Sequence, residues 1–226
     1  MTIEHVAVVG ATGDLGFGLA LRWAMAGIEI VIGSRAADRA ENAATRLKER
    51  VPNARVSGLV NEAAARSSDV VVVTVPFAGH AEIYKSIADH IREDAVVVDC
   101  TVPLATAVGG RATQTLGVWH GSAAQQAQSL MAKGKGVLCA AFHTLAAGEL
   151  ENLEAPIEGD VLVCGSKKDA KKRVAELVDA IPDLRYVDAG RLENAKLVEP
   201  LTALLVGINI RYKTRAGIRI TGLPED

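Results

Sequence analysis

Short apolar runs alternate with longer amphipathic segments along this chain, and the alternation predicts a mostly parallel sheet covered by helices. The apolar runs are rich in valine and isoleucine, which is typical of strands that are buried on both faces. We expect strands at residues 6–9, 28–32, 56–60, 69–76, 95–100, 136–142, 161–164 and 184–187. The fold class is therefore α/β, with a Rossmann-type doubly wound sheet.

The helices are predicted from apolar residues that recur every three or four positions. We expect them at residues 15–26, 36–51, 81–91, 123–131, 167–181 and 192–210, with a brief helix that Asn61 caps. Pro200 lies inside the last segment, which either kinks there or is two helices. Residues 105–120 lack periodicity and are expected to form a loop. We divide the chain into a nucleotide-binding domain, residues 1–190, and a small C-terminal helical appendage of the same domain, residues 191–226.

Glycines punctuate the turn between the first strand and the first helix. Gly10, Gly13 and Gly16 stand there at three-residue spacing. A side chain would keep this backbone away from a pyrophosphate, whereas free N–H groups at a helix N-terminus, with the helix dipole behind them, bind phosphates. The strand, glycine turn and helix together predict a dinucleotide site.

The residues after the second strand indicate which nucleotide binds. NAD enzymes place an Asp or Glu here to accept a hydrogen bond from the ribose 2′-hydroxyl. This chain has Ser34 and Arg35 instead, and Arg39 follows one helical turn later. A hydroxyl and two guanidinium groups suit a 2′-phosphate, whereas arginines that only decorated a helix N-terminus would oppose its dipole. We therefore expect NADP(H) as the cofactor.

Composition narrows the classes of partner. The 25 basic and 27 acidic residues nearly cancel, so we expect no nucleic-acid partner and no membrane surface. The first residues run directly into a strand, which favours a cytoplasmic protein. The three cysteines show no C-x-x-C spacing, so we expect reduced core thiols and no metal site.

Several short motifs occur in a characteristic order, at residues 10–16, 31–35, 74–76, 102–103, 142–145, 161–165, 188–190 and 197–201. In this order the chain resembles the coenzyme F420-dependent NADP oxidoreductases (NADPH:F420 reductases) over nearly its whole length. The resemblance implies an enzyme that transfers a hydride reversibly between C4 of the nicotinamide of NADP(H) and C5 of the deazaflavin of coenzyme F420, the co-substrate. Such a reaction needs two stacked rings and excluded water more than it needs an acid or a base.

The resemblance also implies roles for individual residues. The phosphate contacts fall on Thr12, Gly13, Asp14 and Leu15, beside Gly10 of the glycine turn. The 2′-phosphate contacts fall on Ser34, Arg35 and Arg39. The nicotinamide pocket falls on Val75, Pro76, Leu104 and Leu145, and Ala147 and His143 line the deazaflavin and nicotinamide site. Independently of the resemblance, we expect Thr74 and Phe77 to border the cofactor, because ligands of doubly wound folds lie beyond the carboxyl ends of the strands.

Two of these residues are assigned to the reacting rings. Leu145 would press against the nicotinamide ring, and His143 would orient the ring or handle a proton. The alternative for His143 is a capping bond to local backbone. The other histidines, His5, His80, His90 and His120, are treated as incidental.

The chain departs from the family at two places. Residues 101–125 match poorly and are longer than in the archaeal members, so no deazaflavin contact is assigned there. Phe77 stands where a tryptophan occurs, and Gly79 is an insertion. Two other functions stay open: an NADPH-dependent reductase of another flavin-like or ferric acceptor, as in the ferric reductase domains of eukaryotic membrane proteins that resemble this family, and an NADP-binding sensor without turnover.

The C-terminal segment carries two further hypotheses. Its apolar stripe predicts a homodimer and consists of Leu197, Leu201, Leu204, Leu205 and Ile208. Its basic residues either bind the anionic acceptor or are a solvated helix end, and they are Arg211, Lys213, Arg215 and Arg219.

Overall fold

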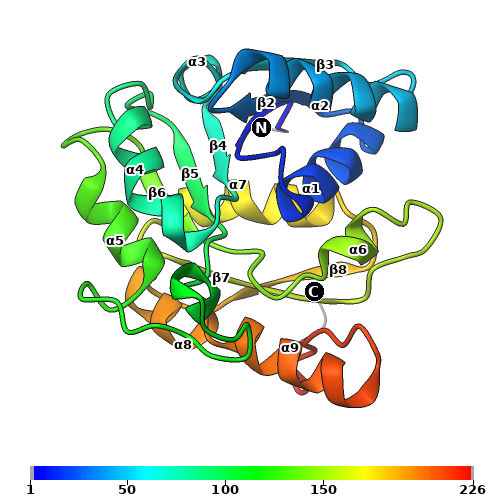
Figure 1. The fold of residues 1–226 in the computed structure, drawn as a ribbon, viewed down its shortest axis with the longest axis vertical. Coiled ribbons are helices and arrows are strands. Elements are labelled where there is room, and N and C mark those ends of the chain that lie inside the picture. The colour runs from blue at the N-terminus through cyan, green and yellow to red at the C-terminus, as the bar shows by residue number, and fades with distance from the viewer. Residues whose placement is uncertain (1–2, 225–226) are drawn as a thin grey trace.

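Eight strands form one sheet in the order β3-β2-β1-β4-β5-β6-β7-β8, with helices on both of its faces (Figure 1). The computed structural model describes residues 3–224. The strands are β1 His5–Val9, β2 Glu29–Ser34, β3 Val56–Val60, β4 Val70–Val73, β5 Val96–Asp99, β6 Val137–Ala140, β7 Gly159–Gly165 and β8 Leu184–Asp188. Strands β1 to β6 pair in parallel, β7 is antiparallel to β6, and β8 is parallel to β7. The predicted doubly wound, mostly parallel sheet is confirmed.

The helices connect these strands across both faces. They are α1 Asp14–Met25, α2 Ala37–Arg50, α3 Asn61–Ser67, α4 Phe77–Ile87, α5 Ala123–Leu130, α6 Ala147–Leu150, α7 Lys168–Asp179, α8 Ala195–Val198 and α9 Leu201–Tyr212. Two 3₁₀ turns join them, η1 Ala105–Val108 and η2 Leu192–Asn194. The turn η1 lies in the predicted loop, which is otherwise irregular apart from a bridge between Leu104 and Thr115.

The structure corrects or decides three points of the helix prediction. Helix α4 begins at Phe77, directly after Pro76, instead of at residue 81. Val60 is the N-cap residue of α3, so the prediction that Asn61 caps this helix is wrong. Pro200 separates α8 from α9, because proline has no N–H to donate inside a helix, and the predicted long segment is therefore two helices.

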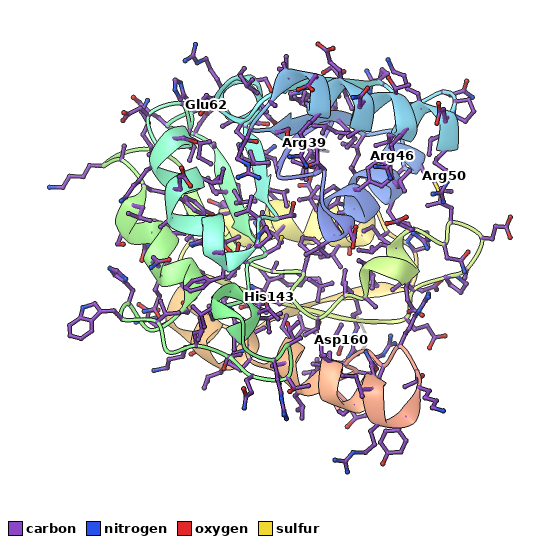
Figure 2. All side chains as sticks on the ribbon, in the orientation of Figure 1. Arg39, Arg46, Arg50, Glu62, His143 and Asp160 are labelled. Atoms are coloured by element: carbon purple, nitrogen blue, oxygen red, sulfur yellow. The ribbon has the colours of Figure 1, made fainter. Side chains whose placement is uncertain are left out.

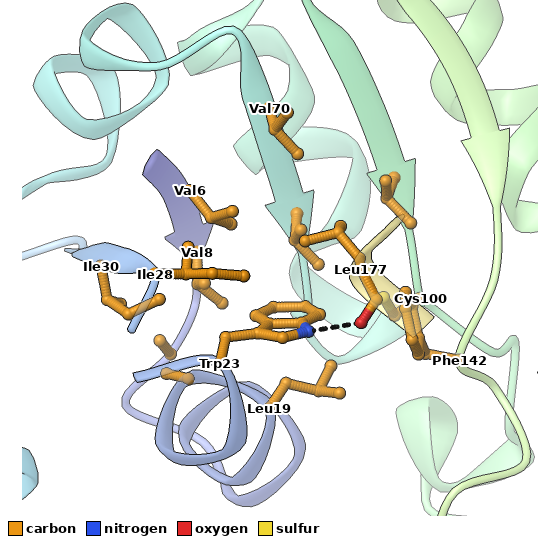
Figure 3. Close-up of a cluster of buried hydrophobic side chains, with 14 of the residues drawn as sticks. Val6, Val8, Leu19, Trp23, Ile28, Ile30, Val70, Cys100, Phe142 and Leu177 are labelled. Atoms are coloured by element: carbon orange, nitrogen blue, oxygen red, sulfur yellow. Dashed lines mark hydrogen bonds between the residues drawn. The ribbon is translucent and has the colours of Figure 1, made fainter. Parts of the chain in front are cut away.

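Strands β4 to β7 send alternate side chains into two large cores, as the period of a strand requires, and Ala7, Val31 and Leu59 of β1 to β3 pack in a third, small cluster. Residues of α1, α2 and α7 cover one face of the sheet, and residues of α4, α5 and α8 cover the other. Figure 3 shows Trp23 of α1 at the centre of the first core, where its indole N–H donates to the Leu177 carbonyl at 2.9 Å. Trp23 also meets Phe142 edge to face, with ring centroids 5.6 Å apart.

The three cysteines are free and buried, as expected. Burial raises the pKa of Cys139 to about 12 and that of Cys164 to about 11, and it raises the pKa of Cys100 as well. All three are therefore protonated core residues at neutral pH.

The C-terminal segment packs at one end of the sheet. Leu192, Ala195 and Val198 belong to the second core, whereas α9 buries Leu205 and exposes Leu204 and Ile210. The chain then returns to β7, where the Asp160 N–H donates to the Ile218 carbonyl at 2.7 Å. Within residues 3–224, no helix combines the length and the apolar character that crossing a membrane requires.

Candidate functional site

The glycine turn brings the start of α1 close to the ends of β1 and β4. Gly10 has φ +84°, and its N–H donates to the Gly33 carbonyl at 3.0 Å. Gly16 lets α1 approach β4, because a Cβ on it would lie 2.2 Å from Thr74 Oγ1. A Cβ on Gly13 would meet nothing closer than the Gly10 carbonyl at 3.5 Å. The turn therefore presses its first and third glycines into the protein and leaves the second open.

A pocket of about 370 Å³ opens over this turn, beyond the carboxyl ends of β1, β2 and β4. Its walls come from the glycine turn, from the ends of β2 and β4, and from the first turns of α2, α3 and α4. The lining residues are Gly10, Thr12, Gly13, Ser34, Arg35, Arg39, Asn61, Val75, Pro76, Ala78, Gly79, Glu82 and Ile83. Eight of the predicted site residues are thus together: Gly10, Thr12, Gly13, Ser34, Arg35, Arg39, Val75 and Pro76.

The basic residues of this pocket lie together, at the end of β2 and in the first turn of α2. Arg35 and Arg39 are exposed, and neither guanidinium forms a hydrogen bond or ion pair within residues 3–224. Figure 2 shows Arg39 on α2. Ser34 is buried beside them, whereas Val75, Pro76 and Ile83 form an apolar end, beside which Glu82 of α4 also lines the pocket. A phosphorylated ribose at the basic end and a planar ring at the apolar end would match this polarity.

Other predicted site residues lie around the pocket. Asp14 and Leu15 form the first turn of α1, directly after the glycine turn. The Thr74 hydroxyl is turned into the protein and donates to the Val9 carbonyl at 3.2 Å, so it supports the turn from behind. Leu104 lines a second hollow of about 210 Å³ that shares Pro76 with the main pocket.

Leu145 and Ala147 come from the segment after β6, on the side of α1. Leu145 packs partly on the first core and borders a small cavity with Arg215 of the C-terminal tail. Ala147 begins α6, which packs closely on α1, since a Cβ on Gly18 would lie 2.6 Å from Leu150 Cβ. The segment therefore stands beside the helix that begins at the glycine turn.

Arg22 of α1 holds this segment in place, and the sequence alone did not indicate it. Its buried guanidinium donates to the carbonyls of Leu150 and Glu149 at 2.9 Å each and to that of Ala155 at 3.0 Å, and it also donates to Asn152. These bonds fix the C-terminal end of α6 and the loop behind it. Arg22 thereby positions the backbone that carries Leu145 and Ala147.

His143 is buried, and neither ring nitrogen has a hydrogen-bond partner within residues 3–224. The alternative in which its ring caps local backbone is therefore wrong. Burial lowers the pKa of His143 to about 4, although the Asp99 charge opposes this shift, so the ring is neutral at pH 7. The preceding residue, Phe142, has φ +64°, a strained value for a bulky side chain. The strained residue thus precedes a buried, neutral imidazole whose two nitrogens have no partner among the described residues, and Figure 2 shows where His143 lies.

His80 is not incidental, which corrects the sequence-based interpretation. It is fully buried on α4 and lies between the rings of Phe77 and Tyr84, with centroid distances of 5.9 and 4.8 Å. It forms an ion pair with Asp99 at the end of β5. The spacing of Phe77, His80 and Tyr84 by three and four residues is the sequence signal for one face of a helix. The predicted helix begins at residue 81, however, so His80 lies outside the prediction.

Comparison with known proteins matches the chain to a family. Residues 5–103 match the family described as NADP oxidoreductase coenzyme F420-dependent. The F420-dependent NADP reductase of Methanothermobacter thermautotrophicus is 43% identical over 99% of this chain and 97% of its own length. The F420-dependent NADP reductase of Methanocaldococcus jannaschii is 40% identical over 96% of this chain and 98% of its own length.

Solved structures agree on the fold. A putative F420-dependent NADP reductase from Arthrobacter sp. FB24 superposes with a TM-score of 0.80 at 21% identity, over 96% of this chain and 98% of that one. A pyrroline-5-carboxylate reductase from Coxiella burnetii superposes with a TM-score of 0.56 at 14% identity, over 95% of this chain and 73% of that one. The near full-length similarity to the two archaeal reductases shows the relationship: this chain belongs to the coenzyme F420-dependent NADP oxidoreductase family.

Proposed function

We propose that this protein transfers a hydride reversibly between NADP(H) and coenzyme F420. The observation that carries the proposal is the polarity of the pocket: Ser34 and two arginines without a partner among the described residues line one end, and the apolar Val75 and Pro76 line the other, near Glu82. The family relationship supplies the acceptor, because the relatives that match nearly the whole chain are named F420-dependent NADP reductases. Bound together, the nicotinamide and the deazaflavin supply the hydride donor and acceptor carbons.

The chain's own residues bind and orient the nucleotide. Gly13 leaves the N-terminus of α1 open, so that the N–H groups of its first turn, including those of Asp14 and Leu15, can donate to phosphate oxygens. Ser34, Arg35 and Arg39 supply a hydroxyl and two guanidinium groups to a ribose 2′-phosphate. Thr12 completes the turn, and Thr74 supports it from behind.

The apolar residues beyond β4 and β6 hold the rings and exclude water. Val75, Pro76 and Leu104 form one wall, since Pro76 borders both the main pocket and the hollow that contains Leu104. We assign Leu145, Ala147 and the neutral His143 to the opposite wall, although none of the three lines the main pocket. The C-terminal segment is assigned to the same wall, because Arg215 joins Leu145 in lining the small cavity.

Isotope transfer tests the proposal directly. NADPH carrying deuterium at C4 should pass the label to C5 of F420, and NADPH oxidation should be much faster with F420 than with FMN, FAD or ferric chelates. Oxidation with a ferric chelate or FMN alone would replace F420 by another acceptor. No oxidation with any acceptor, together with intact NADPH binding, would favour a sensor. Equal affinity for NADH and NADPH would reject the assignment of Ser34, Arg35 and Arg39.

We further propose a homodimer, formed through α8 and α9, in the cytoplasm. Leu197 is 64% exposed, Leu204 is 59% exposed and Ile210 is 68% exposed, which leaves an apolar strip that a second copy would cover. Sedimentation equilibrium at micromolar concentration should give a dimer, and Leu204→Glu should give a monomer that still binds NADPH. A monomeric wild type would reject the dimer.

A further inference from the structure

Asn61 is a buried polar residue in the wall of the nucleotide pocket. It is the first residue of α3 and follows Val60, which pairs with Ser34 in the register of β2 and β3. It is only 2% exposed, yet it lines the same pocket as Ser34, Arg35 and Arg39. The backbone pairing therefore brings its side chain beside the polar groups at the end of β2.

The amide of Asn61 has no hydrogen-bond partner within residues 3–224. Its Oδ1 is buried and unpaired within the described residues, and it lies close to the backbone of Gly33, since a Cβ built on Gly33 would be 3.1 Å from it. An unpaired buried amide destabilises a folded protein unless something else satisfies it. The helix-capping bond that would have used this side chain does not form.

We propose that Asn61 donates a hydrogen bond to the 2′-phosphate of the NADP ribose and contributes to the preference for NADP over NAD. Oδ1 is buried beside Gly33, whereas Nδ2 is not among the buried unpaired atoms, so the amide N–H₂ is the end that faces the pocket. This inference rests on the NADP specificity proposed above. Asn61 adds an uncharged donor to the hydroxyl of Ser34 and the guanidinium of Arg35.

The chemistry favours the phosphate over the adenine or the ribose hydroxyls. A donor gains most from a charged acceptor, and a 2′-phosphate offers three charged oxygens. Ser34, the partner of the residue just before Asn61, lies where NAD enzymes place the acid that reads the ribose 2′ position. Asn61 is therefore next to the position where the two cofactors differ.

Nucleotide fragments isolate the contact. The Kd of 2′,5′-ADP and of 5′-AMP is measured for the wild type and for Asn61→Ala, Asn61→Leu and Asn61→Asp, together with the melting temperature of each free protein. Alanine and leucine should weaken 2′,5′-ADP about tenfold and change 5′-AMP less than about twofold. Aspartate should weaken 2′,5′-ADP about a hundredfold, because its carboxylate would face the phosphate.

Leucine separates a ligand contact from a structural role. It has a similar size and removes an unpaired polar group, so the free protein should melt no lower than the wild type while its affinity for 2′,5′-ADP falls. The inference would be overturned if the variants lost affinity equally for both fragments, or if no variant lost affinity. It would also be overturned if affinity fell only in variants with a lower melting temperature. A wild type that binds 5′-AMP and 2′,5′-ADP equally would reject the NADP specificity itself, and the inference with it.

Discussion

The His80 imidazole donates from Nε2 to Asp99 Oδ2 at 2.7 Å, and both side chains are fully buried beneath the wall that carries Pro76 and Phe77. Nδ1 of the same ring lies 3.1 Å from Gln126 Oε1. Burial opposes a charged ring, but the Asp99 carboxylate and the two hydrogen bonds outweigh it, so the pKa of His80 is raised. Burial also opposes a charged Asp99, but His80 and the Thr101 N–H keep the pKa of Asp99 below its usual value.

Breaking this pair should destabilise the protein in a pH-dependent way. Because the pKa of His80 is raised, His80 contributes its full stabilisation below the unfolded pKa of about 6.5, and this stabilisation is lost at higher pH. Because the pKa of Asp99 is lowered, Asp99 contributes its stabilisation above the unfolded pKa of about 3.9. The pair therefore contributes most between these two values. Asp99→Asn should cost about 3 kcal/mol at pH 5.5 and less at pH 9, measured by urea unfolding.

A double-mutant cycle separates the pair from the surrounding packing. His80→Gln combined with Asp99→Asn removes both charges, so the double variant should recover part of the loss, with a coupling energy of about 1 kcal/mol or more at pH 5.5. Additive losses that do not change with pH would show that the two residues contribute through packing alone.

Gly13→Val should abolish NADPH binding and leave the protein folded. Its Cβ meets only the Gly10 carbonyl at 3.5 Å and Gly13 has φ −93°, so the free protein accepts a side chain that would block the phosphates. Calorimetric titration with NADPH and a melting curve check both parts.

Gly16→Ala is the matched control for Gly13→Val, because it places a side chain against the protein instead of in the phosphate site. Its Cβ would lie 2.2 Å from Thr74 Oγ1 and 2.9 Å from the Ala11 Cα, so this smaller change should lower stability by about 1–3 kcal/mol. Intact NADPH affinity in Gly13→Val would place the phosphates elsewhere.

The sequence predicted the glycine turn and the basic end of the pocket because each depends on residues that are close together along the chain. Gly10 to Gly16 and Ser34 to Arg39 are such local motifs. His80 and Arg22 depend on partners that only the folded chain brings near, since Arg22 reaches carbonyls 127 to 133 positions away. Asn61 was assigned to a helix cap on local preference, whereas the chain placed Val60 there instead.

Arg22→Met should loosen the segment that carries Leu145 and Ala147. Four carbonyls lose a charged donor, so we expect a loss of about 2–4 kcal/mol in unfolding free energy. Hydrogen exchange should rise in residues 144–155 and stay unchanged in β1 and β4.

Arg50 provides the control, because it donates to the Glu151 carbonyl in the same loop at 2.6 Å but is exposed (Figure 2). Arg50→Met should change stability by less than about 0.5 kcal/mol. Equal effects of the two substitutions would mean that burial of the Arg22 guanidinium adds nothing to its contacts.

Glu199 should make the stability of the wild type fall as the pH rises. Its buried carboxylate accepts hydrogen bonds from the N–H groups of Ala123 and Ala124 at 2.9 and 3.0 Å. Glu199 directly precedes Pro200, so these bonds tie the start of α5 to the junction between α8 and α9. Burial raises the pKa of Glu199 from 4.5 to about 7 in spite of these bonds. The folded state then holds this proton more tightly than the unfolded state, so stability is lost between about pH 4.5 and 7.

Glu199→Gln keeps an oxygen acceptor but cannot ionise. Its stability relative to the wild type should therefore increase by about 2–3 kcal/mol between pH 5 and pH 8, measured by urea unfolding. Glu193→Gln, on the exposed side of η2, should stay within about 0.5 kcal/mol of the wild type at both pH values. A relative stability of Glu199→Gln that is flat with pH would mean that Glu199 is ionised throughout, because the two N–H groups of α5 then outweigh the cost of burying its charge.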